Sequence, residues 1–312
     1  METAVTLTPN PAIDISTAVD EVLPIRKLRC EAARRDPGGG GINVARVVRR
    51  LGGEVSAIYP AGGNSGGLLR RLVEREGVRS LAISVAEETR EDFTVLEASS
   101  GKQYRFVLPG AELSESEWKA CLTGLEDMQD MPAYVVGSCS LPPGVPEDFY
   151  ARVAQIAKSR GSRAVVDTSG KALSKVMDEG VFLIKPNLRE LQELLNARLP
   201  HRSARVSACR KLIDRGSAEN IVLSLGADGA ILVTPEEAYS ARSPELEVVS
   251  SVGAGDSFLG GMIWRLAGGG DVADAFRYGV AAGSAAVLNA GTELCHSEDA
   301  VRLYDKIQLT KI

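Results

Sequence analysis

One short segment combines glycines with a carboxylate in a way that suits phosphoryl transfer. The segment consists of Gly253, Ala254 and Gly255, and Asp256 follows at once, ahead of an apolar run. The run predicts a helix whose free N–H groups and positive dipole end face out of the turn, which is an anion-binding arrangement. A carboxylate there suits transfer to an alcohol, because donors stabilise the transferred group while a base takes the hydroxyl proton. The structural alternative is a turn with an aspartate N-cap.

A glycine run and an early carboxylate are candidates for the alcohol side of this site. The run includes Gly39 and Gly40, and Asn43 lies one turn into the helix predicted to follow. Glycines at a helix start let a ligand approach the backbone closely. Asp14 follows the first predicted strand, where a carboxylate can accept hydrogen bonds from sugar hydroxyls. The alternatives are a flexible linker for the glycines and a turn for Asp14.

Two further segments suit the nucleotide side. Lys185, Asn187 and Glu190 follow a predicted strand, and the last two fit either a helix capping box or an oxygen-rich Mg²⁺ site. A second loop joins two predicted strands and reads by itself as a hairpin turn. With the segment before Asp256 this loop could border a nucleotide, and it consists of Ser224, Leu225, Gly226, Ala227, Asp228 and Gly229.

Basic side chains flank a predicted hairpin. Arg90 and Arg105 lie on either side of it, and Lys27 lies in an earlier charged segment. They are either solvated surface residues or a clamp for a substrate phosphate, which arginine binds through two parallel hydrogen bonds. The sequence contains no G-x-x-x-x-G-K-[ST] and no G-x-G-x-x-G after a strand, so the common phosphate-loop and dinucleotide motifs are absent.

Composition limits the possible classes of protein. The 312 residues are 44% hydrophobic and 25% charged, and the net charge of -5 gives no general attraction to nucleic acid or anionic membranes. No stretch predicts a membrane span, and the start lacks signal-peptide features, so we expect a cytoplasmic protein. The five cysteines are scattered without a C-x-x-C pair, which disfavours disulfides and zinc. The two histidines lie in polar, turn-like sequence, which disfavours a histidine base.

The elements that must position these residues alternate along the chain. Apolar runs predict buried strands at residues 4–8, 55–60, 133–136, 164–166, 181–184 and 221–225, with helical patterns between them. This is the pattern of a mostly parallel sheet covered by helices, in which ligands bind beyond the carboxyl ends of the strands. Residues 93–108 predict a hairpin outside that sheet, and residues 13–35 predict an irregular segment.

The order of these motifs resembles the ribokinase-like (PfkB-type) sugar kinases, and the resemblance extends from Thr6 to Ala286. It is strongest to the phosphosugar kinases of the minor bacterial 6-phosphofructokinase type. The resemblance implies a three-layer α/β/α fold with a mostly parallel sheet. It also implies one kinase domain over residues 1–312, with a small β lid from about residues 11–36 and 88–108. Members commonly form homodimers through the lid.

The resemblance also implies residue roles. Asp256 would be the catalytic base, with anion-hole N–H groups from Gly253, Ala254 and Gly255. Sugar contacts would come from Asp14, Gly39, Gly40 and Asn43, and phosphosugar contacts from Arg90, Arg105 and Ser140. ATP and Mg²⁺ would lie against Lys185, Asn187, Glu190, residues 224–229 and Ser284, with Glu190 reaching Mg²⁺ through water. A K⁺ site would use Ser250, Val252, Ala286, Asn289 and Gly291. Lys27 would act at a neighbouring subunit's site or a regulatory nucleotide site.

The expected reaction is therefore ATP-dependent phosphorylation of a ketohexose phosphate. Fructose 6-phosphate giving the 1,6-bisphosphate is the favoured reaction. The same chemistry on tagatose 6-phosphate or fructose 1-phosphate is the alternative. A non-catalytic sugar-phosphate sensor on the same fold is a further alternative, which the intact Asp256 and glycine run disfavour.

Overall fold

A ten-stranded sheet forms the centre of the computed structural model, which describes residues 4–312. Its strands are β1 (Ala4–Leu7), β4 (Val55–Gly62), β5 (Arg79–Val85), β8 (Tyr134–Ser138), β9 (Arg163–Asp167), β10 (Val181–Ile184), β11 (Ala218–Ser224), β12 (Ala230–Val233), β13 (Ala238–Ala241) and β14 (Leu309–Lys311). The order is β14-β13-β12-β11-β10-β9-β8-β1-β4-β5. Every pairing from β11 to β5 is parallel, and the β11, β12, β13 and β14 pairings are antiparallel.

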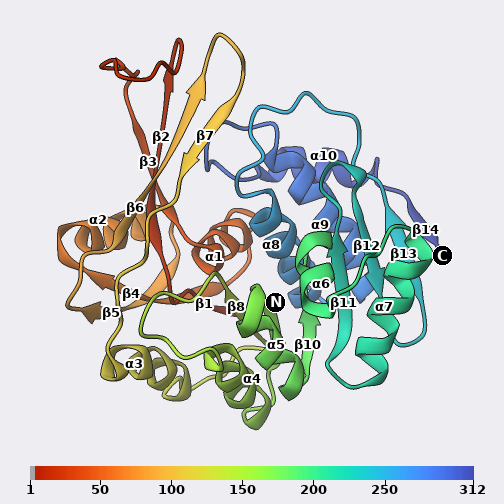
Figure 1. The fold of residues 1–312 in the computed structure, drawn as a ribbon. Coiled ribbons are helices and arrows are strands. Elements are labelled where there is room, and N and C mark those ends of the chain that lie inside the picture. The colour runs from red at the N-terminus through yellow and green to blue at the C-terminus, as the bar shows by residue number, and fades with distance from the viewer. Residues whose placement is uncertain (1–3) are drawn as a thin grey trace.

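Helices cover both faces of this sheet (Figure 1). One face packs against α1 (Gly40–Arg50), α2 (Gly63–Arg75), α8 (Ala254–Ala267), α9 (Val272–Ala286) and α10 (Ser297–Tyr304). The other packs against α3 (Glu115–Glu126), α4 (Phe149–Ser159), α5 (Gly170–Glu179), α6 (Leu188–Leu195) and α7 (Arg202–Asp214). No helix among residues 4–312 is long and apolar enough to cross a membrane.

Alternate side chains of the central strands enter two separate cores. In β8, Val135 packs in the core on the α4 side, whereas Tyr134 and Val136 pack in the core on the α8 side. Because successive strand side chains point to opposite faces, a strand covered on both sides must be apolar at every position. This requirement explains the continuous apolar runs of the sequence, and the strands predicted from them are confirmed.

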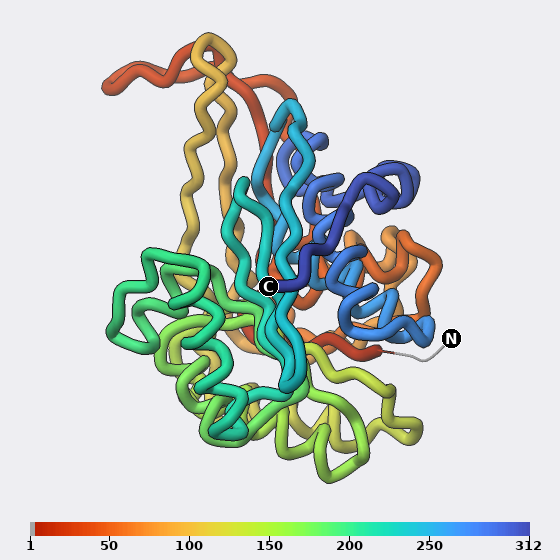
Figure 2. The backbone as a smooth tube through the Cα atoms, turned by 90° about the vertical axis from the view of Figure 1, so that its right-hand side faces the viewer, coloured from red at the N-terminus to blue at the C-terminus, as the bar shows by residue number. Residues whose placement is uncertain are grey.

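A second, four-stranded sheet projects from the body as a lid (Figures 1 and 2). It contains β2 (Ala12–Val19), β3 (Arg34–Gly38), β6 (Arg90–Glu97) and β7 (Gln103–Phe106), in the order β3-β2-β6-β7. The β6–β7 hairpin confirms the prediction for residues 93–108. The prediction that residues 13–35 are irregular was wrong at both ends. There β2 pairs with β3 and with the distant β6, so tertiary pairing outweighs the polar sequence of β3.

Candidate active site

The N-terminus of α8 has free backbone donors. Gly253 is its N-cap at φ +74, and a side chain there would meet Leu294 Cδ2 at 2.4 Å. The Ala254 N–H lies 3.4 Å from the Ser251 carbonyl, whereas the N–H groups of Gly255 and Asp256 have no acceptor among residues 4–312. Two adjacent unpaired donors at a helix N-terminus form an anion-binding site. Of the predicted set, the Gly253 N–H also has no acceptor among residues 4–312, and Asp256 adds its own N–H to the set.

Asp256 lies inside the first turn of α8 and is not its N-cap. Its Oδ2 accepts a hydrogen bond from Asn43 Nδ2 at 2.9 Å. Burial raises the pKa of Asp256 to about 6, and the Asn43 hydrogen bond acts in the opposite direction. Asp167 also raises this pKa, and Lys185 lowers it. A carboxylate with a pKa just below neutral is suited to accept a proton at physiological pH.

The glycine run begins α1 against the ends of β1 and β8. Gly39 is the N-cap at φ +102, and a side chain on Gly40 would meet Ser138 Oγ at 2.3 Å. Only glycine fits this close approach without displacing its neighbours. The helix start is confirmed, and the linker alternative is excluded. The resulting position of α1 brings Asn43, which is 4% exposed, to Asp256.

Asp14 lies on β2 of the lid sheet, opposite Asp36 of β3 and diagonal to Gly38. A side chain on Gly38 would meet the Asp14 carboxylate at 2.5 Å. Burial raises the pKa of Asp14 to about 7, with further raising contributions from Asp92 and Asp256. Arg46 and Arg105 lower it. The turn alternative for Asp14 was therefore wrong, and its carboxylate lies within the electrostatic influence of Asp256.

We expect Asp14→Asn to be more stable than the wild type at neutral pH. The folded pKa of about 7 exceeds the ordinary value of 3.8, so the folded state binds more protons between these values. The free energy of unfolding therefore falls as the pH rises from about 4 to 7. Asparagine does not ionise, so the substitution removes this pH-dependent loss of stability. Calorimetry should show the Tm advantage growing to at least about 2 °C by pH 7.5. The control Asp20→Asn lies at an exposed position of the lid, and an advantage that did not grow with pH would contradict the prediction.

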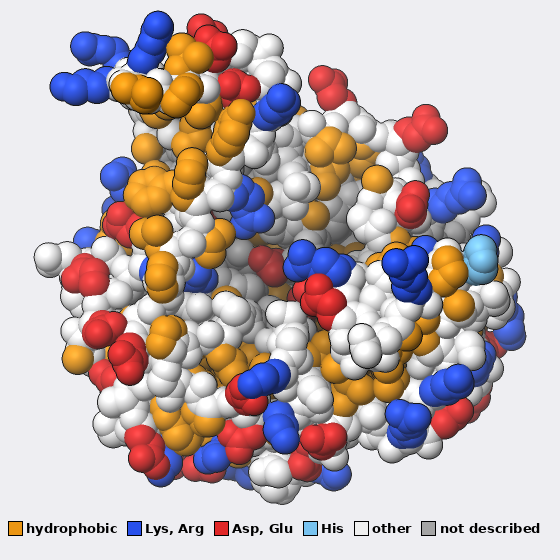
Figure 3. Space-filling model, in the orientation of Figure 1, with side chains coloured by type: hydrophobic (Ala, Val, Ile, Leu, Met, Phe, Trp, Pro, Cys, Tyr) orange, Lys and Arg blue, Asp and Glu red, His pale blue; other side chains and the backbone are white. Residues whose placement is uncertain are grey.

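The lid arginines occupy different environments. Arg90 donates to the carbonyls of Asn10 at 3.2 Å and Leu108 at 3.0 Å, and it lies 3.4 Å from Asp92. Arg105 is exposed, and its side chain forms no hydrogen bond or ion pair with any residue from 4 to 312. Its charge lowers the pKa values of both Asp14 and Asp256. Arg105 therefore acts on the hollow between lid and body that Figure 3 shows, with charged side chains on its floor.

Ser140 and Lys27 lie in different parts of the structure. The Ser140 hydroxyl accepts a hydrogen bond from Asn10 Nδ2 at 3.1 Å, and Asn10 in turn contacts Arg90. Lys27 lies in the exposed loop that links β2 to β3. That loop is at the opposite end of the strands from Gly38, at the free tip of the lid in Figure 1. The structure therefore does not bring Lys27 to the Asp256 site of its own chain.

Lys185 follows β10 in the chain, and its amino group lies close to the start of α8, on the predicted nucleotide side. Its side chain is 7% exposed, and its Nζ is 2.8 Å from Asp167 Oδ2. A side chain added to Gly255 would meet the same Nζ at 3.5 Å. Burial lowers the pKa of Lys185, but Asp167 above all, with Asp256 and Glu190, raises it above its ordinary value. A lysine at this place supplies a positive charge next to the free N–H groups.

Asn187 and Glu190 form the capping box at the start of α6. Asn187 Oδ1 accepts from the Glu190 N–H at 2.9 Å, and Glu190 Oε2 accepts from the Asn187 N–H at 2.8 Å. The structural alternative is thus realised. The remaining Glu190 oxygen has no hydrogen bond with any residue from 4 to 312. One free carboxylate oxygen fits a water-mediated contact with a hydrated Mg²⁺.

The second predicted nucleotide segment lies beside the first. Residues 224–229 connect β11 to the antiparallel β12 through a short 3₁₀ helix, η1 (Gly226–Asp228), as the hairpin alternative required. The Ser224 N–H donates to the Pro186 carbonyl at 3.0 Å, which places the loop next to Lys185. Ser284 on α9 is buried, and its hydroxyl has no partner among residues 4–312. An unpartnered hydroxyl is available to a ligand.

The predicted K⁺ ligands lie in two neighbouring segments. Ser250 donates through its N–H to the Val287 carbonyl at 3.3 Å and through its hydroxyl to the Gly291 carbonyl at 3.2 Å. The Asn289 N–H lies 3.1 Å from the Ala286 carbonyl, and the Val252 N–H lies 3.2 Å from Ser250 Oγ. In residues 4–312 no three His, Cys, Asp or Glu side chains are grouped to hold a metal. The Val287, Ala286 and Gly291 carbonyls of these segments each accept a hydrogen bond in the structure.

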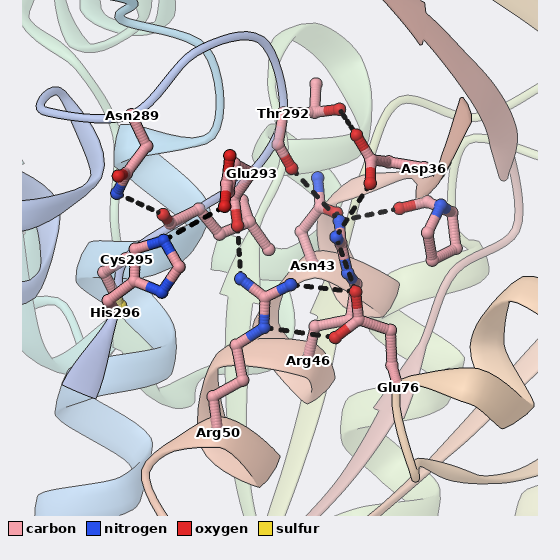
Figure 4. A network of polar contacts seen from close by, with 12 residues as sticks. Asp36, Asn43, Arg46, Arg50, Glu76, Asn289, Thr292, Glu293, Cys295 and His296 are labelled. Carbon is pink, nitrogen blue, oxygen red and sulfur yellow. Dashed lines mark hydrogen bonds and ion pairs between the residues drawn. The ribbon is translucent and has the colours of Figure 1, made fainter. Parts of the chain in front are cut away.

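Sequence reasoning missed one residue of the site and one supporting network behind it. Asp167 ends β9 and pairs with Lys185, and its place after a predicted strand was a usable signal. The network surrounds the buried Arg46 and includes Glu76, Asp36 and Arg50 (Figure 4). Arg46 belongs to a helical pattern, in which an arginine indicates a solvent-facing position. No sequence signal distinguished it.

The fold and this arrangement of donors, carboxylate and lysine define an α/β phosphotransferase. The pattern described as "pfkB family carbohydrate kinase" matches residues 9–299. The chain belongs to the pfkB family of carbohydrate kinases, and its fold is the ribokinase-like α/β fold.

Three relatives indicate its place in the family. ATP-dependent 6-phosphofructokinase isozyme 2 of Mycobacterium tuberculosis is 45% identical and covers 96% of this chain and 88% of its own. The crystal structure of Escherichia coli phosphofructokinase-2 in complex with substrates and products gives a TM-score of 0.92 at 39% identity, covering 97% and 98% of the two chains. The 1-phosphofructokinase of Borreliella burgdorferi is 30% identical and covers 98% of both.

Proposed function

We propose that this protein transfers the γ-phosphoryl group of ATP to fructose 6-phosphate, giving fructose 1,6-bisphosphate. The observation that carries this proposal is the Asp256 carboxylate at the N-terminus of α8. There it lies beside the unpaired N–H groups of Gly255 and Asp256 and is held by Asn43. The relatives named 6-phosphofructokinase are more similar to this chain than the one named 1-phosphofructokinase.

In this proposal each group at the α8 terminus has one task. Asp256 accepts the proton of the attacking sugar hydroxyl, because its pKa of about 6 leaves it largely ionised at neutral pH. The N–H groups of Gly255 and Asp256 stabilise charge on the transferred phosphoryl group. Lys185 adds positive charge on the nucleotide side. Bound Mg²⁺ would neutralise the phosphates, with Glu190 contacting it through water and Asn187 in support.

We propose the remaining substrate contacts from the types of the residues and from where they lie in the structure. Asp14 and Asn43 would bind sugar hydroxyls, with Gly39 and Gly40 allowing close approach. Arg105 would bind the substrate's phosphate directly, and Arg90 and Ser140 would line the same end of the hollow. Residues 224–229 and Ser284 would contact ATP, and the carbonyl-rich segments at Ser250 and Gly291 would hold K⁺.

A coupled ADP-release assay with fructose 6-phosphate, tagatose 6-phosphate, fructose 1-phosphate and free fructose tests the proposal. We expect the highest kcat/KM with fructose 6-phosphate. A preference for fructose 1-phosphate or tagatose 6-phosphate would reassign the substrate within the same chemistry. Turnover with none of them, alongside measurable binding of fructose 6-phosphate, would identify a sugar-phosphate sensor and overturn the kinase proposal.

Arg105→Met should raise the KM for fructose 6-phosphate by about 10- to 100-fold, the usual value of charge-assisted hydrogen bonds to a phosphate. The KM for ATP should stay near the wild-type value, because Arg105 lies on the lid. Steady-state kinetics with each substrate varied in turn measures both. Lys102→Met, on the same hairpin and exposed, is the matched control, and an equal effect of both substitutions would remove Arg105 from the phosphate site.

We further propose a homodimer formed through the lid. Large apolar side chains on the lid and its loops are exposed, including Ile25, Phe93, Phe106 and Val107. Figure 3 shows hydrophobic side chains gathered on the projecting lid. Exposed apolar patches of this kind mark interaction surfaces. In such a dimer Lys27, at the lid tip, would lie near the partner's site. Sedimentation analysis of Phe106→Ser against wild type tests the interface, and an unchanged dimer would refute it.

A further inference from the structure

A buried arginine lies directly behind Asn43. The Arg46 side chain is 0% exposed. One guanidinium nitrogen donates to the Pro37 carbonyl at 2.9 Å, Asn43 Oδ1 at 3.0 Å and the Thr292 carbonyl at 3.3 Å. The other donates to Glu76 Oε1 at 2.9 Å, and Figure 4 shows this convergence. Burial of a charge is costly unless its partners are in place, so this guanidinium is held in one orientation.

The arginine fixes which way the Asn43 amide points. Asn43 and Arg46 are three residues apart in α1, so they share a face of the helix. A guanidinium has donors only, so the oxygen of the amide must face Arg46. The amide nitrogen then faces Asp256 Oδ2, at 2.9 Å. A flipped amide would set two donors against each other at Arg46 and two acceptors at Asp256.

We propose that Arg46 is a positioning residue for Asp256, acting through Asn43, with Glu76 and Asp36 holding Arg46 in place. The inference rests on the proposed role of Asp256 as the base. The Asn43 donor both aims the carboxylate and stabilises its ionised form. Arg46 touches neither substrate by this assignment.

Other groups also act on Asp256 and must be separated from this one. The charged or titratable side chains that influence it from neighbouring elements are Asp14, Arg105, Cys139, Asp167 and Lys185. Arg46 also lowers the pKa of Asp14. A test must therefore show that any effect of Arg46 passes through Asn43 and not through Asp14.

The test is the pH dependence of kcat for Arg46→Met. Loss of the oriented donor should move the acid limb to higher pH by about one unit or more, the value of one hydrogen bond to a charged group. A shift of one unit, from about 6 to about 7, lowers kcat at pH 6.5 by about 3-fold. Arg50→Met is the matched control, because Arg50 binds the same Glu76 at 2.8 Å without contacting Asn43. It should lower Tm and leave the acid limb in place.

Asn43→Leu and the double variant Asn43→Leu/Arg46→Met complete the cycle. We expect the acid limb of the double variant to shift by the same amount as that of Asn43→Leu, because Arg46 affects Asp256 only through the Asn43 amide. An additional shift in the double variant, or a folded Arg46→Met with an unmoved acid limb, would overturn the inference. If Arg46→Met does not fold, the pH dependence of kcat is measured for Arg46→Lys, which keeps the charge. An unmoved acid limb in that variant would likewise overturn the inference. Wild-type inactivity on every sugar phosphate would instead refute the proposed function.

Discussion

Asp256→Asn should lower kcat with fructose 6-phosphate by about 10² to 10⁴-fold, the usual contribution of a positioned general base. Asparagine keeps the size of the side chain and its contact with Asn43, but it cannot accept the hydroxyl proton. The KM for ATP should change little, because the free N–H groups of α8 belong to the backbone and remain. Steady-state kinetics at pH 8, well above the Asp256 pKa of about 6, measures the full loss.

The control for this substitution is Asp178→Asn, at an exposed position of α5. It makes the same change in charge and should turn over at the wild-type rate. In the wild type, kcat should fall as the pH drops through about 6, because protonated Asp256 is not a base. An Asp256→Asn variant within about threefold of wild type would show that another group takes the proton.

Lys185→Met should lower kcat by about 10² to 10³-fold, the cost of removing one preorganised group that stabilises transition-state charge. Its buried amino group is 2.8 Å from Asp167 and lies against Gly255 at the start of α8. A second effect has a definite sign. Lys185 lowers the pKa of Asp256, so its loss should move the acid limb of kcat to higher pH.

Loss of Lys185 also leaves the half-buried Asp167 without its partner, and this lowers stability by itself. The double variant Lys185→Met/Asp167→Asn removes both charges and separates stability from catalysis. Lys171→Met removes an exposed lysine paired with Glu147 and is the matched control. If the double variant recovered both Tm and kcat, Lys185 would have only a structural role.

The sequence by itself determined the central sheet and the places where chemistry can occur. Strands buried on both faces must be apolar throughout, so β8, β9, β10 and β11 were readable from local composition. Asp256 and the glycine run were readable for a related reason, since a glycine turn before a helix specifies a backbone conformation. The residue types in these strands and glycine turns are set by the local backbone conformation alone.

Only the tertiary structure decided which groups meet. The β2–β6 pairing joins segments about 80 residues apart, and no local pattern in residues 13–35, which contain most of β2, indicates it. Arg46, Glu76 and Asp36 likewise come from different elements, and each reads as an ordinary surface residue in its own segment. Their burial, and the direction in which the Asn43 amide points, follow from the packing of α1 against the base of the lid. Local sequence carries backbone preference, whereas long-range packing fixes the electrostatic environment of a side chain.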